Sequence, residues 1–75
     1  MDHEDPWKQM TLATAELATL AIGVTERLHG LTGAESEGAE GALRRLAEAS
    51  RRLGGQVAET VFEREAERLR RMRQG

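Results

Sequence analysis

The sequence predicts an all-α protein, an antiparallel helical hairpin of two long helices that dimerises into a four-helix bundle. Two segments carry apolar residues at helical spacing, and a cluster of glycines interrupts the pattern between them. A chain of 75 residues without cysteine buries only a small core and forms no disulfide, so it needs another source of stability. We expect one domain over residues 1–75, with helices at about 6–29 and 39–73 and a connector at about 30–38.

The first predicted helix begins at Asp5-Pro6. Aspartate is favoured at the N-cap, and proline is favoured at the first helical position because an N–H there has no helical partner. A second, thinner apolar strip, formed by Leu12, Ala15 and Ile22, accompanies the main stripe and predicts a second packing neighbour. The main stripe consists of Met10, Ala13, Leu17, Leu20, Ala21, Val24 and Leu28.

The segment after His29 predicts a corner. Gly30 is suited to the left-handed conformation that ends many helices, and Thr32 with Glu35 has the spacing of a capping box. Gly33 and Gly38 follow closely, and each glycine costs about 1 kcal/mol relative to alanine inside a helix. We therefore expect a loose connector and firm helix only from about residue 39.

The second predicted helix is interrupted by Gly54-Gly55. Leu53 and Val57 stay in helical phase across the two glycines, and no good N-cap residue precedes Gln56. We therefore expect a kink within one long helix, with a split into three helices as the alternative. The stripe on this helix runs through Leu43, Leu46, Ser50, Leu53, Val57 and Val61, and continues to Phe62, Leu69 and Met72.

The predicted interface follows from the unequal lengths of the two helices. About three turns of the second helix would extend past the start of the first, and a second copy would cover their apolar residues. We expect the chain to bind itself, as a homodimer or higher oligomer, with another helical protein as a further candidate partner. The expected interface residues are Leu12, Leu17, Leu20, Ile22, Val24, Leu53, Val57, Val61, Phe62, Leu69 and Met72.

Charge and composition exclude several classes of protein. A formal net charge of −2 gives no overall attraction to nucleic acid or to an anionic membrane. The acidic start, MDHEDPW, lacks the apolar core of a signal peptide, and no apolar run reaches the length of a membrane span. Without cysteine, thiolate zinc sites and cysteine catalysis are excluded. We expect a cytoplasmic protein with no membrane partner.

Two short patterns could hold a metal ion. Glu26 and His29 have the Glu-x-x-His spacing of ferritin-like carboxylate sites, which also need carboxylates from other helices. His3 stands behind a free amino terminus, an arrangement that can bind Cu(II) or Ni(II). Both patterns arise readily by chance. We expect neither a metal nor a cofactor, and we keep a carboxylate metal protein using Glu26 and His29 as an alternative.

Arginine pairs are the most visible polar feature. Arg44-Arg45 and Arg51-Arg52 are seven residues apart, so an arginine-lined helix that binds nucleic acid is a second alternative. Glutamates precede several arginines by four residues, however, which is typical of helix-stabilising ion pairs. No aromatic residue lies among the arginines to stack on bases. We therefore interpret them as a solvated helix surface.

Catalysis has little support in the sequence. Tyrosine and cysteine are absent, and no nucleophile, base and orienting group can be assembled. The predicted function is a non-enzymatic protein–protein interaction module, an adaptor, regulator or small subunit that acts through self-association and helix packing.

Overall fold

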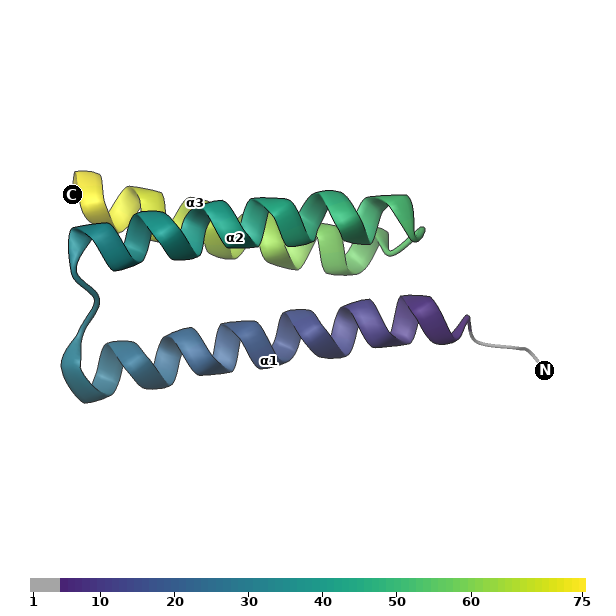
Figure 1. Ribbon diagram of the computed structural model, residues 1–75, viewed down its shortest axis with the longest axis horizontal. Helices are drawn as coiled ribbons and strands as arrows, with labels where there is room; N and C mark the ends of the chain where they lie inside the picture. Colours follow the sequence, from purple (N-terminus) through teal and green to yellow (C-terminus); the bar gives the residue numbers. More distant parts are fainter. Residues whose placement is uncertain (1–4) are drawn as a thin grey trace.

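Three α-helices make up most of the described part of the chain. The computed structural model describes residues 5–75, and its helices are α1 (Pro6–His29), α2 (Gly33–Arg52) and α3 (Gln56–Gln74). Helix α1 runs antiparallel to α2, and α3 turns back along α2, so that α1 and α3 run in the same direction (Figure 1). No strand occurs among residues 5–75, so the prediction of an all-α fold is confirmed.

The N-caps predicted for α1 and for the helix after the first corner are present. Asp5 accepts a hydrogen bond from the backbone N–H of Trp7 at 3.0 Å, which caps α1. Gly30 ends α1 with a φ of 74° and its N–H donates to the carbonyl of Glu26, but its ψ of 174° differs from that of the predicted left-handed cap. Thr32 and Glu35 form the reciprocal capping box, with both hydrogen bonds at 3.0 Å.

Helix α2 begins at Gly33 rather than near residue 39, so the predicted loose connector is too long. The capping box satisfies N–H groups at this helix start, which offsets the cost of Gly33 and Gly38. Contacts from α3 also stabilise the start of α2: Arg73 donates to the Ser36 hydroxyl at 3.0 Å and pairs with Glu40.

The chain reverses direction at Gly54-Gly55, so the expectation of one kinked helix is wrong and the three-helix alternative is correct. Gly54 has a φ of 80°, a conformation that costs little only in glycine. A Cβ on Gly55 would lie 2.5 Å from Oγ1 of Thr11 in α1. The two glycines therefore serve a tight turn that packs directly against α1.

The core lies mainly between α2 and α3, which pack along their lengths, while α1 packs chiefly on α3. Phe62 and Leu69 are the largest fully buried side chains. They do not project beyond the first helix as expected, because α3 folds back on α2. Four of the seven core residues are alanine, so one chain buries little large apolar surface; the seven are Ala15, Leu43, Ala47, Ala58, Phe62, Ala66 and Leu69.

Candidate functional site

Helix α1 is apolar on two opposite sides, and the structure buries the thinner one. Thr11 and Ala15 are buried on the side that packs against α3, and Ile22 packs on the core from the same side. At 100° per residue, the main stripe lies on the opposite side of α1. The main stripe therefore faces outward, and the thinner strip faces the core.

The outward stripe is exposed along its whole length. Leu17 is 67% exposed, Leu20 is 60% and Leu28 is 72%. Single exposed apolar residues are ordinary, but a continuous row of them along one helix is not. We call this row the α1 stripe, and its members are Met10, Ala13, Leu17, Leu20, Ala21, Val24 and Leu28.

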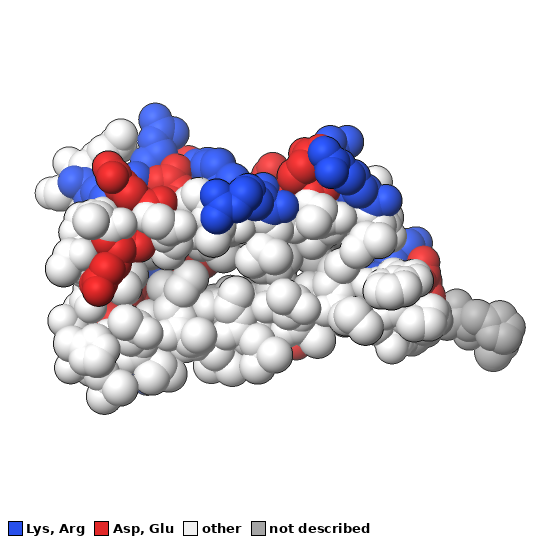
Figure 2. Space-filling view, in the orientation of Figure 1, with Lys and Arg blue, Asp and Glu red and all other residues white. Residues whose placement is uncertain are grey.

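The α1 stripe is also free of charge. Three charged residues, Glu16, Glu26 and Arg27, lie between Met10 and Leu28 in the sequence, and none of them is a member of the stripe. Figure 2 shows the same property on one side of the molecule: the surface over α1 is almost entirely uncharged, while charged groups gather over α2 and α3. A surface that makes no ion pairs and is apolar along its length is suited to packing against another apolar helix.

A groove between α1 and α2 continues the α1 stripe. These two helices make few contacts with each other, and a hollow of about 180 Å³ opens between them near the start of α1. Trp7 of α1, Leu46 of α2 and Leu53, which follows the end of α2, are partly or largely exposed at this groove. We call it the α1–α2 groove, and its lining residues are Trp7, Met10, Thr11, Thr14, Leu46, Ala49, Ser50, Leu53 and Phe62.

The side of α1 that faces α3 carries charges instead. Arg68 donates to both carboxylate oxygens of Glu26, at 2.9 and 3.2 Å, and to both oxygens of Glu65, at 2.6 and 3.0 Å. Glu65 is only 7% exposed. The two carboxylates raise the pKa of Arg68, chiefly through the hydrogen bonds from Glu65 and then Glu26. This cluster joins α1 to α3.

The predicted metal motif has a different partner in the structure. Glu26 binds the Arg68 guanidinium, and His29 is exposed at the end of α1. Among residues 5–75, no group of three or more His, Cys, Asp or Glu side chains could hold a metal ion. His3 lies outside the described residues.

Many of the arginines form ion pairs with glutamates. Arg44 bonds Glu40 at 2.9 and 3.1 Å, and Arg73 reaches the same carboxylate from α3. Hydrogen bonds from Arg73 and then Arg44 lower the pKa of Glu40 below its usual value of 4.5. Ion pairs also involve Arg51, Arg52, Arg68 and Arg70. Paired arginines offer fewer free charges to phosphates than the sequence alone indicates.

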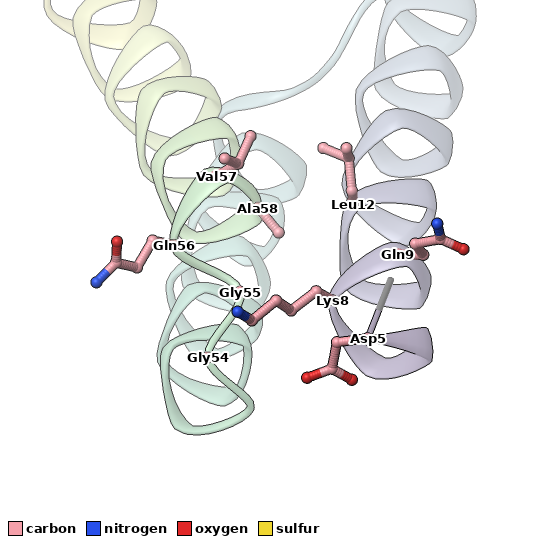
Figure 3. A pocket seen from close by; sticks show the side chains of 9 residues that line it. All are labelled: Asp5, Lys8, Gln9, Leu12, Gly54, Gly55, Gln56, Val57 and Ala58. Atoms are coloured by element: carbon pink, nitrogen blue, oxygen red, sulfur yellow. The ribbon is translucent and has the colours of Figure 1, made fainter. Parts of the chain in front are cut away.

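A second hollow, of about 510 Å³, lies where the start of α1 meets the α2–α3 turn. Leu12 and Val57 point toward each other across it, and the Lys8 side chain extends over the turn at Gly54 and Gly55 (Figure 3). Its lining includes the charged residues Asp5 and Lys8 and the amides Gln9 and Gln56. It differs in this respect from the α1–α2 groove, which no charged residue lines.

The predicted interface residues fall into three groups. Phe62 and Leu69 are buried in the core of the single chain, so their expected exposure is a wrong prediction. Leu12, Ile22 and Val61 are half-buried between helices. The remaining six are exposed: Leu17, Leu20, Val24, Leu53, Val57 and Met72.

Several residues of the apolar surface were not among the predicted interface residues. Met10 and Leu28 belong to the stripe that the helical spacing already identified, and Leu46 belongs to the stripe of the second helix. Trp7 was harder to identify as an interface residue, because the sequence distinguishes it only as the single tryptophan of the chain.

No family model, curated protein or solved structure matched this chain in the comparisons. None of the three helices is long and apolar enough to cross a membrane within residues 5–75. The exposed apolar surface of α1 is therefore the feature from which we infer a function.

Proposed function

We propose that this protein is a non-enzymatic interaction module that acts through self-association, with the α1 stripe and the α1–α2 groove as its contact surface. One observation carries the proposal: the α1 stripe is apolar, uncharged and exposed from Met10 to Leu28. Isolated soluble domains rarely expose a continuous apolar surface of this extent.

The small core supports the same proposal. Among residues 5–75, the core contains three large side chains, Leu43, Phe62 and Leu69, and the rest of the core is alanine. Chains of this size often gain the stability they lack by burying more apolar surface in an oligomer. The α1 stripe supplies such a surface without disturbing the core.

Light scattering on a sizing column tests the proposal. The wild-type chain should have a mass at least twice the 8.3 kDa of one copy, in chelator and in added Fe(II) alike. Leu17→Glu should give a single-copy mass with unchanged helical circular dichroism, because Leu17 lies outside the core. Thr60→Glu is the matched control, since Thr60 is exposed on α3, and it should associate like the wild type.

A wild-type chain that stays at 8.3 kDa up to its solubility limit would refute self-association. Association that requires Fe(II) would instead support the carboxylate metal alternative at Glu26 and His29. Both results are distinguishable from loss of folding, because circular dichroism reports the helices directly.

A further inference from the structure

We infer that a second copy of this chain packs its α1 helix antiparallel against the first α1, across a two-fold axis near the middle of the stripe. This geometry depends on the self-association proposed above and specifies which surfaces meet. It replaces the sequence-based hypothesis, in which turns of the second helix beyond the first were covered.

The chemistry of the three helices indicates which surface binds the α1 stripe. The α1–α2 groove and the α1 stripe form an uncharged surface, so the partner surface must also be an apolar helix face. Within residues 5–75, the longest row of exposed apolar residues lies on α1: α2 and α3 expose the large apolar side chains Leu46, Val57 and Met72 but carry arginine and glutamate over much of their exposed surface. The α1 helix of a second copy therefore fits better than α2 or α3.

The α1 stripe is long enough for an extended helix-to-helix contact. Met10 and Leu28 are 18 residues apart, so the stripe is about 27 Å long at 1.5 Å per residue. A standard interface buries about 800 Å² on each partner. A dimer of that class therefore requires contact along the whole stripe together with the adjoining groove.

The direction of packing follows from the shape and charge of α1. A two-fold axis perpendicular to α1 brings the same stripe of both copies together, with the two α1 helices antiparallel. The helix dipoles then oppose each other, whereas a parallel pair would align them. Ala13 and Ala21 place small side chains on the stripe, so the helices can approach to about 8–10 Å.

The antiparallel register predicts which residues lie near each other. Leu17 and Leu20 fall near the axis, so each lies close to its counterpart or to the other residue in the second copy. Met10 lies near Leu28 of the second copy. The two copies of Met10 are separated by about 27 Å along the helix axis, at 1.5 Å per residue.

Cysteine crosslinking tests this arrangement cleanly, because the chain contains no cysteine. We would use full-length single variants, oxidised at a concentration where the wild type is associated. Leu20→Cys should give a disulfide-linked dimer as the main species. Met10→Cys and Leu28→Cys should each stay largely uncrosslinked alone, and mixing the two variants should give the linked dimer. Thr60→Cys on α3 is the exposed control and should not crosslink.

Each alternative gives its own pattern. A parallel pair would crosslink Met10→Cys with itself, which overturns the antiparallel geometry but keeps self-association. A dimer by light scattering with no crosslink at any of the three stripe positions would place the interface elsewhere and overturn this inference. A single-copy mass for the wild type would overturn the proposed function as well, and would favour another helical protein as the occupant of the stripe.

Discussion

Arg68 in α3 and Glu26 in α1 lie 42 residues apart in sequence, yet the guanidinium donates to both oxygens of that carboxylate, at 2.9 and 3.2 Å. The same guanidinium also pairs with the buried Glu65. A single arginine therefore binds two carboxylates and joins α1 to α3, and the three groups together keep one net negative charge. Arg68 also binds Glu26, the glutamate that the sequence indicated as a candidate metal ligand.

The first prediction concerns this cluster. Arg68→Met should lower the free energy of unfolding by about 1–3 kcal/mol, because it leaves the carboxylate of Glu65 buried without its partner. Arg64→Met, at an exposed position of the same helix, should change it by less than about 0.5 kcal/mol. Urea unfolding followed by circular dichroism measures both, and equal effects would contradict the assigned role of Arg68.

The second prediction concerns the turn between α2 and α3. Gly55→Ala should lower the free energy of unfolding by about 1–3 kcal/mol, because the new Cβ would lie 2.5 Å from the Thr11 hydroxyl oxygen. Adding Thr11→Ala should restore part of the loss by removing that oxygen.

Gly38→Ala provides the control for the same type of substitution. Nothing lies within 4 Å of a Cβ at Gly38, and the residue is inside α2. This variant should be more stable than the wild type by about 0.5–1 kcal/mol. A Gly55→Ala variant as stable as Gly38→Ala would show that the turn does not approach α1 closely.

The third prediction concerns pH. Arg73 and Arg44 lower the pKa of Glu40 in the folded chain below its usual value of 4.5. The stabilisation from Glu40 is therefore fully present above about pH 4.5, and it is lost as the pH falls through the lowered folded-state pKa. Glu40→Gln should reduce the melting temperature at pH 7, and the difference from wild type should shrink toward acid pH.

Thermal melts of Glu40→Gln from neutral to acid pH measure this change. Glu37→Gln is the matched control, because Glu37 is exposed on α2 and forms no ion pair among the described residues. A difference between wild type and Glu40→Gln that stays constant down to the lowest pH would show that the charge of Glu40 is not its source.

The fourth prediction links association to stability. If the α1 stripe is buried in a dimer, the wild-type melting temperature should rise with protein concentration across a roughly hundredfold range, because binding of a second copy stabilises only the folded chain. The melting temperature of Leu17→Glu should not depend on concentration. Concentration-independent melting of the wild type would contradict burial of the stripe.

Local interactions explain why the caps and the first helix could be predicted from sequence. The N-cap at Asp5, the helix end at the positive-φ Gly30 and the Thr32–Glu35 capping box each depend on residues within a few positions of one another. The α1 stripe was visible for the same reason, since its spacing is a property of one helix.

Tertiary contacts decided the rest. Leu53 and Val57 keep helical phase across Gly54-Gly55, so the pattern alone could not distinguish a kink from a reversal; the close approach of Gly55 to Thr11 belongs to the folded arrangement. The same is true of Glu26, whose partner Arg68 lies on a different helix.

The sequence by itself determined that the chain is helical, where α1 begins and ends, and that α1 is apolar on two sides. Only the tertiary structure decided which side of α1 enters the core. On the thinner strip, Thr11 lies close to Gly55 and Ala15 is fully buried in the core. Close packing therefore selects the thinner strip for the core and leaves the larger apolar surface facing outward.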